Sequence, residues 1–127
     1  MTEELDPRLV ELAHRMFDLA RQGGTERLSA YVDKGVPVDM TDASGNTLLM
    51  LAAYHGHADT VSALVARGAD VNRLNDRQQS PLAGAIFKDE EEVVRVLVDA
   101  GADLDAGAPS ARLTAEMFDR GHLLEEG

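Results

Sequence analysis

Hydrophobic residues in the middle of the chain recur three and four positions apart. Val61, Leu64 and Val65 share one face of a predicted helix, because residues at this spacing lie on the same side of an α-helix. The segment before it, 48–54, is almost entirely apolar, and Thr47 is a residue type that favours the N-cap of a helix. The pattern predicts pairs of short antiparallel helices and an all-α fold.

The same pattern returns in the next segment of equal length. Segments 41–73 and 74–106 align without a gap, and self-similarity at a fixed period of this length is typical of a solenoid of stacked units. Segments 1–40 and 107–127 match less well and are predicted to be N-terminal and C-terminal capping units of a single domain over 1–127. The identical pairs are Leu49/Leu82, Ala52/Ala85, Val61/Val94, Leu64/Leu97, Val65/Val98, Gly68/Gly101, Ala69/Ala102 and Asp70/Asp103.

The second repeat carries clear helix boundaries. Ser80 and Pro81 predict an N-cap followed by proline at the first helical position, where its missing N–H does no harm. The acidic run 90–92 opens the next helix, and negative side chains are favourable at the positive end of a helix dipole. We therefore interpret the acidic run as a helix start in preference to an acidic binding site.

One position inside the second repeat departs from the first. Gly84 stands where the first repeat has Leu51. Glycine inside a helix is destabilising by about 1 kcal/mol relative to alanine, and a missing leucine also removes packing. Either a larger neighbour such as Ile86 or Phe87 fills the space, or the site is loosely packed.

The two ends predict different helices. Asp6 and Pro7 begin a longer helix that carries one apolar stripe. Near the other end, Ser110 leads into a last helix over about 111–120. A second helix, begun at Gly121, is cut short, so we expect the C-terminal unit to be the weakest part of the stack.

The first repeat contains two distinctive stretches, DASGNTLLMLAAYHGH from Asp42 to His57 and GADVN over 68–72. These stretches resemble the ankyrin family. The family pattern has Thr-Pro-Leu-His where this repeat has Thr-Leu-Leu-Met, and the second repeat has Gln78 and 89–90 in place of the turn glycine and Gly-His. The resemblance covers residues 17–106 well. It implies a slightly curved solenoid whose first helices line a concave face, with extended turns projecting as fingers.

The resemblance also implies a recognition scaffold, whose ligands lie across the fingers and the concave face. Carried over position by position, this places the binding residues in the fingers, at their starts and at the exposed ends of the inner helices. These residues are Arg21, Gln22, Met40, Ala43, Ser44, Asn46, Tyr54, His55, Arg73, Asp76, Arg77, Gln79, Phe87 and Lys88.

Two aromatic residues stand out among them. Tyr54 and Phe87 occupy equivalent positions of adjacent repeats and are flanked by basic side chains. Rigid aromatic residues and arginine dominate the binding energy of protein interfaces. We predict a small apolar ridge that binds the partner; the alternative is that both rings fold onto neighbouring helices as core.

Composition and charge limit the classes of partner that we expect the protein to bind. The net charge of −11 argues against binding nucleic acid or anionic lipid. It favours a partner with a basic patch, although acidity is also a common solubility device. Ten arginines against two lysines, with a single isoleucine, indicate a GC-rich bacterial genome. We expect a cytoplasmic protein, because cysteine is absent, the N-terminus carries no apolar signal segment and no stretch reaches the roughly 18 apolar residues of a membrane span.

Catalytic and metal sites are not expected. His55 and His57 alternate, but a zinc site needs three or four ligands, and His14 and His122 lie at opposite ends of the predicted solenoid. The sequence has neither a glycine-rich phosphate loop nor a convincing catalytic triad. We expect no cofactor, no metal and no enzymatic activity.

Two functions remain open. The first is an adaptor or regulator that holds a partner protein on its concave face. The second is an inhibitor or immunity protein that masks a basic toxin or enzyme, which small size and acidity fit. We expect a monomer, unless the C-terminal end is covered by a second copy of the chain.

Overall fold

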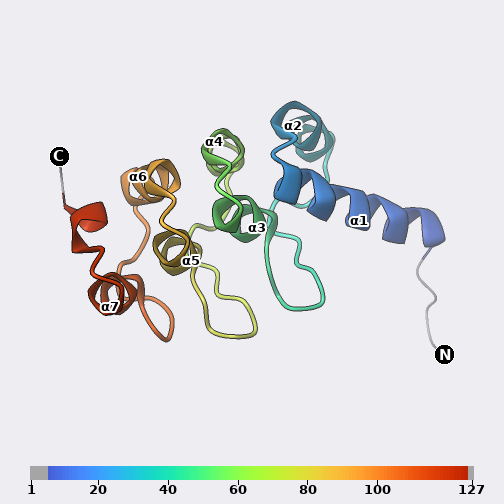
Figure 1. Ribbon diagram of the computed structural model, residues 1–127. Coiled ribbons are helices and arrows are strands. Elements are labelled where there is room, and N and C mark those ends of the chain that lie inside the picture. Colours follow the sequence, from blue (N-terminus) through green and yellow to red (C-terminus); the bar gives the residue numbers. More distant parts are fainter. Residues whose placement is uncertain (1–5, 126–127) are drawn as a thin grey trace.

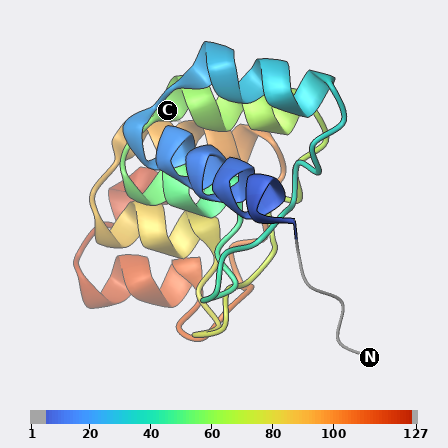
Figure 2. The same ribbon diagram turned by 90° about the vertical axis from the view of Figure 1, so that its right-hand side faces the viewer.

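The computed structural model describes residues 6–125; residues 1–5 and 126–127, which belong to the outer ends of the two predicted capping units, lie outside it. Within it the chain forms helices in two stacked rows, with α1, α3, α5 and α7 as the inner row and α2, α4 and α6 as the outer row (Figure 1). Extended turns project from the inner row on one side, and Figure 2 shows these fingers side by side along one edge. The helices are α1 (Pro7–Gln22), α2 (Thr25–Asp33), α3 (Leu48–Tyr54), α4 (Ala58–Ala66), α5 (Pro81–Phe87), α6 (Glu91–Asp99) and α7 (Ala111–Met117), followed by the 3-10 helix η1 (Gly121–Leu124).

Hydroxyl side chains begin the three short inner helices, as the sequence predicts for the first two. The Thr47 hydroxyl oxygen accepts from the Met50 amide at 3.0 Å, and Ser80 caps α5 in the same way at 3.0 Å. Ser110 accepts from the Leu113 amide at 3.1 Å. Each cap satisfies a backbone donor that has no partner inside its own helix.

The C-terminal unit differs from the prediction. The N-cap residues Thr47 and Ser80 are 33 positions apart, which is one full repeat. Ser80 and Ser110 are only 30 positions apart, so the finger before α7 is three residues shorter than the one before α5. The last helix, expected over 111–120, ends at Met117, and the helix expected from Gly121 is a single 3-10 turn. A helix this short gains too few backbone hydrogen bonds to stand without docking.

The core runs along the stack between the two rows. Most leucines and valines that are identical in the two repeats are buried, whereas Val65 and Val98 are half-buried. Full burial of such a side chain stabilises the fold by about 1.5–3 kcal/mol. Because each unit packs on its neighbours, these contacts connect α1, α3, α5 and α7 in series. The pairs Leu49/Leu82, Val61/Val94 and Leu64/Leu97 are each 1% exposed or less.

The space beside Gly84 is filled, but not by the residues expected. A Cβ atom at Gly84 would lie 3.2 Å from the Met50 methyl carbon and 3.5 Å from a Tyr54 ring carbon. Met50 and Tyr54 reach across from the preceding repeat. Ile86, two positions along the same helix, points to another side of it, and the Phe87 side chain is 45% exposed. Neither of these two residues therefore fills the gap.

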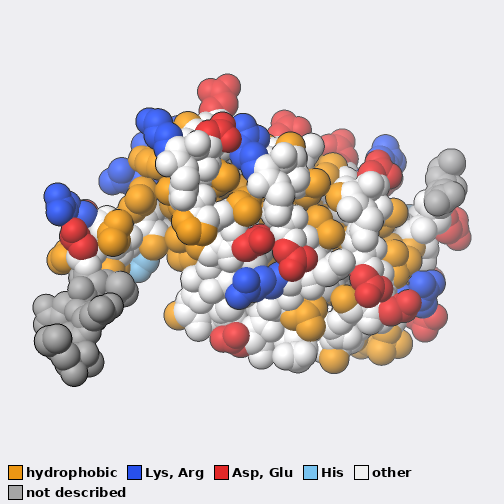
Figure 3. All heavy atoms as spheres, turned by 180° about the vertical axis from the view of Figure 1, so that it is seen from behind, with side chains coloured by type: hydrophobic (Ala, Val, Ile, Leu, Met, Phe, Trp, Pro, Cys, Tyr) orange, Lys and Arg blue, Asp and Glu red, His pale blue; other side chains and the backbone are white. Residues whose placement is uncertain are grey.

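α1 is longer than the other inner helices and projects beyond the stack (Figure 1). Leu9 and Val10 on the projecting part are 60% and 36% exposed. Together with Ala13 and the finger at 41–44 they line a groove of about 750 Å³. Figure 3 shows the hollow beside this projecting helix, with hydrophobic side chains along it. Between residues 6 and 125, no helix combines the length and apolar character needed to cross a bilayer.

Candidate functional site

The C-terminal ends of the inner helices present two equivalent positions in every unit. Phe87 and Lys88 lie seven and eight positions after the N-cap Ser80, and Met117 and Phe118 lie seven and eight positions after the N-cap Ser110. Met117 and Phe118 are therefore the equivalents of Phe87 and Lys88. We call this set the inner-helix row. Its members are Arg21, Gln22, Tyr54, His55, Phe87, Lys88, Met117 and Phe118.

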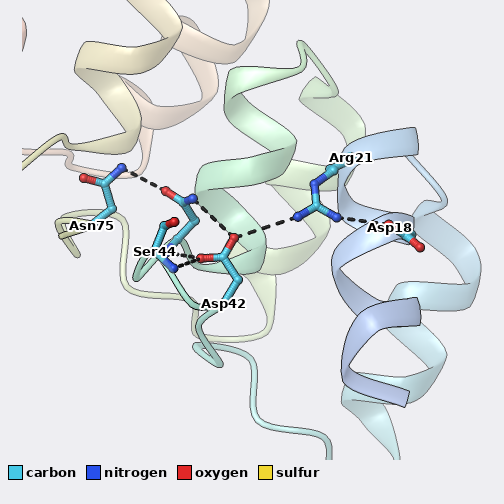
Figure 4. A network of polar contacts seen from close by, with 6 residues as sticks. Asp18, Arg21, Asp42, Ser44 and Asn75 are labelled. Carbon is cyan, nitrogen blue, oxygen red and sulfur yellow. Dashed lines mark hydrogen bonds and ion pairs between the residues drawn. The ribbon is translucent and has the colours of Figure 1, made fainter. Parts of the chain in front are cut away.

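Asp42 orders the first finger. Its Oδ1 atom accepts hydrogen bonds from the amides of Ser44 and Asn46, both at 2.9 Å. Its Oδ2 atom lies 3.8 Å from the guanidinium of Arg21, which also contacts Asp18 at 3.0 Å (Figure 4). The charge of Asp42 is therefore largely balanced within the protein, and the first finger has a defined backbone.

Asn75 takes the same role in the second finger. Its Oδ1 atom accepts from the amides of Arg77 and Gln79, both at 3.0 Å. Its Nδ2 atom donates to Asn46 at 2.8 Å, which links the two fingers. Sequence reasoning missed Asp42 and Asn75 as organising residues, although the alignment of the two repeats pairs them.

Tyr54 lies in the centre of the inner-helix row and is half-buried. The Lys88 Nζ atom lies 5.1 Å from the centre of the Tyr54 ring, within the range of a cation–π interaction. His55 meets the same ring edge-on, with ring centres 5.8 Å apart. Part of Tyr54 covers Gly84, so the ring has a packing role as well as an exposed face.

Phe87 pairs with Phe118. Their ring centres are 5.2 Å apart at 87°, and both side chains are 45% exposed. Arg120 lies over Phe118 at 5.5 Å and donates to the Phe87 carbonyl oxygen. Met117 beside them is 61% exposed. The exposed aromatic group at Phe87 therefore extends through Phe118 toward the C-terminal end, while Tyr54 contacts His55 and Lys88.

Met117 and Phe118 were missed because a uniform step of one repeat length from Phe87 leads to Arg120. The shorter finger displaces the register by three positions. Ser110, a strong N-cap residue, is the signal in the sequence that could have found them.

The face around His55 is electropositive. Partial burial, followed by the charges of His57, Lys88 and Arg21, lowers the pKa of His55 below its ordinary value. Arg77, on the neighbouring finger, and Lys88 form no ion pair with a carboxylate of the described residues. On a chain with a net charge of −11, this is a local excess of positive charge.

The remaining predicted residues divide into two groups. Met40 packs against the core, and Asn46 and Gln79 are half-buried in finger hydrogen bonds, so these three also support the fold. The exposed ones are Gln22, Ala43, Ser44, Arg73 and Asp76. The structure brings seven of the predicted residues together around a groove of about 410 Å³, namely Arg21, Ser44, Asn46, Tyr54, His55, Arg77 and Gln79.

The histidine of the Gly-His pair has a structural partner. The His57 Nε2 atom lies 2.7 Å from the Arg21 carbonyl oxygen, and the ring packs against Gly23 of the preceding unit. Over residues 6–125, no group of three or more histidine, aspartate and glutamate side chains is arranged to hold a metal ion.

Comparison with known proteins places these features in a family context. A family model described as ankyrin repeats (three copies) matches residues 16–108. An ankyrin repeat protein of Pseudomonas aeruginosa is 51% identical over 57 residues, which are 45% of this chain and 33% of that protein. The crystal structure of the human ASB11 ankyrin repeat domain superposes with a TM-score of 0.75 at 25% identity, covering 86% of this chain and 52% of that domain. The chain thus spans a minor part of the bacterial relative and about half of the human domain.

Proposed function

Because the chain belongs to the ankyrin-repeat family, we propose that it is a non-catalytic adaptor or regulator that holds a partner protein across its fingers and inner-helix row. Ankyrin repeats are in general protein-interaction modules, and no catalytic group was identified in the sequence. The cytoplasmic location expected from the sequence is part of the proposal, and cell fractionation would test it.

One observation carries the proposal. Phe87, Met117 and Phe118 form an exposed apolar group on the inner-helix row, beside the cation Lys88. Aromatic side chains next to basic ones are the residues that contribute most to binding at protein interfaces. Large contiguous apolar patches on a protein surface mark interaction sites.

The alternative is an inhibitor or immunity protein that masks a basic toxin or enzyme. Its support is the acidic surface outside the inner-helix row, where 90–92 and Asp99 lie at the two ends of the outer helix α6. A basic partner would bind that surface, whereas the proposed adaptor uses the electropositive inner side. Removal of the positive charge at Lys88 should therefore change partner binding in the first case and leave it unchanged in the second.

The test compares two glutamate variants in affinity purification from the native cell. Phe87→Glu places a charge in the inner-helix row, and Ala66→Glu places the same charge at an exposed site on the outer helix α4. We expect one partner to be retained by the parent protein and by Ala66→Glu but lost with Phe87→Glu. Retention of the same proteins by all three chains would contradict the proposal, provided that circular dichroism shows all three folded.

A further inference from the structure

We propose that the partner presents a linear segment with separate acidic and apolar parts to this face. Its carboxylates lie beside His55, Arg77 and Lys88, and its apolar side chains lie against Phe87, Met117 and Phe118. The inference rests on the proposed function and adds the chemistry and direction of the bound segment.

The acidic part is argued from charges that the protein leaves unbalanced. Arg77 and Lys88 lack a carboxylate partner among residues 6–125, although most arginines of the described chain have one. Two nearby carboxylates are already engaged, Asp42 in the first finger and with Arg21, and Asp89 with Arg120 at 4.0 Å. Asp76, next to Arg77 on the second finger, is exposed and forms no ion pair among residues 6–125, so it balances at most one of the two cations. A carboxylate of the partner would supply the missing counter-charge.

The apolar part is argued from the other half of the row. Phe87 and Phe118 are 45% exposed and Met117 is 61% exposed, and Leu113 nearby is 47% exposed. Arg120 is held over Phe118 by its bonds to the Ile86 and Phe87 carbonyl oxygens. Phe87 adjoins Lys88, and Met117 and Phe118 lie one unit further along the stack, so the face runs from basic to apolar toward the C-terminal end.

The repeat spacing sets the spacing within the segment. Packed helices lie about 8–10 Å apart, and an extended peptide advances about 3.3 Å per residue. The acidic and apolar residues of the segment should therefore be about three positions apart. Nucleic acid is disfavoured because the net charge of −11 repels a polyanion.

The first experiment measures binding of fluorescent peptides. One peptide carries two glutamates followed after about three positions by leucine and phenylalanine; a second has lysines in place of the glutamates, and a third has alanines in place of the apolar pair. We expect the acidic–apolar peptide to bind the parent protein best. The double variant Arg77→Glu with Lys88→Glu should weaken it at least about tenfold and should bind the lysine peptide instead.

The matched control is Arg95→Glu, because Arg95 is exposed on the outer helix α6. It should leave the binding of all three peptides unchanged. Rescue of the double variant by the lysine peptide separates recognition from unfolding, since an unfolded variant would bind neither peptide. Preference of the parent protein for the lysine peptide, or for a single-stranded oligonucleotide, would overturn the proposal.

A second copy of the chain is a further outcome to test. Sedimentation that reveals a dimer, lost in Phe118→Glu, would place the chain itself on this face and overturn the proposed occupant. If the peptides fail to discriminate while Phe87→Glu still loses a cellular partner, the proposed function stands and the acidic–apolar assignment falls. If no cellular partner depends on Phe87, the proposed function itself fails.

The pH profile gives an independent readout at His55. Basic side chains face it from three elements, Arg21 on α1, His57 before α4 and Lys88 after α5, and Arg77 and Asp42 line the same groove. A bound carboxylate favours the protonated ring, so binding takes up a proton. Affinity should rise as the pH falls from about 7.5 to about 5.5, above the range in which peptide carboxylates protonate.

His55→Asn should flatten this profile while keeping the preference for the acidic peptide. An affinity of the parent protein that stays level or falls over the same range would overturn the position of the carboxylates beside His55.

Discussion

The two full repeats, 41–73 and 74–106, share one backbone but differ at residues that usually define such a unit. Gly45 and Gly56 of the first repeat have φ angles of 78° and 81°, and Gln78 and Asp89 of the second keep positive φ angles of 64° and 59°. An L-residue in this conformation costs about 1–2 kcal/mol. The second repeat therefore adopts the turn because of its neighbours, whereas the first adopts it with residues suited to it.

The junctions between units differ in the same way. His57 contacts the Arg21 carbonyl oxygen of the preceding unit, and Arg120 likewise donates to the Phe87 carbonyl oxygen. Glu90, at the equivalent position between them, lacks an N–H donor in its side chain, and its carboxylate lies against Gly56. The same position between two units is therefore occupied by side chains of different chemistry. The first junction has a hydrogen bond to the preceding unit that the second junction lacks.

The largest expected effect comes from giving the second repeat the leucine of the first. Gly84→Leu should lower the free energy of unfolding by about 1–3 kcal/mol, because the Met50 and Tyr54 side chains already occupy the space. Urea denaturation measures the change. Ala66→Leu, at an exposed helix position, is the control and should change stability little; a more stable Gly84→Leu protein would mean that the gap is open.

A smaller loss of stability is expected from substitutions at the two junctions, and it should be larger at the first junction than at the second. His57→Ala removes the contact with the Arg21 carbonyl oxygen and should lower the free energy of unfolding by about 1–2 kcal/mol. Glu90→Ala should change it by less, since no such bond is lost. Thermal unfolding of both variants checks this order, and equal losses would show that the hydrogen bond does not distinguish the junctions.

The smallest expected effect comes from giving the second finger the glycine that the first finger has at the equivalent position. Gln78→Gly relieves the positive φ angle and should raise stability by about 0.5–1 kcal/mol, after the extra backbone freedom of glycine in the unfolded chain is subtracted. Gln79→Gly is the matched control and should be destabilising. A lower melting temperature for Gln78→Gly than for the parent protein would argue that the Gln78 side chain supports the finger.

Much of the fold could be predicted because its signals are local. The caps Thr47 and Ser80 and the start of α1 at Asp6–Pro7 depend on residues within one helical turn, and the structure has all three. The solenoid followed from the period of the apolar positions, and its ankyrin form from the resemblance of residues 42–57 and 68–72 to that family. The contacts that were missed join different units: the filling of Gly84 by the preceding repeat, and the place of Phe118 beside Phe87.

These contacts depend on which side chain of a neighbouring unit reaches across, and periodicity carries no information about that. The candidate site was predicted in part for the same reason. The residues of the regular repeats were located by position, and those of the shortened unit were not.

The hydrogen bonds between successive fingers have a consequence for the thermodynamics of association. The Asp76 amide donates to the Ser44 carbonyl oxygen at 3.0 Å, and the Ala108 amide donates to the Gln78 carbonyl oxygen at 2.9 Å. Fixing the backbone of one flexible residue costs about 1–2 kcal/mol in conformational entropy. Because the fingers are ordered before a partner arrives, binding loses little of that entropy on this side. Differences in affinity among partners should then reflect side-chain contacts and appear mainly in dissociation rates.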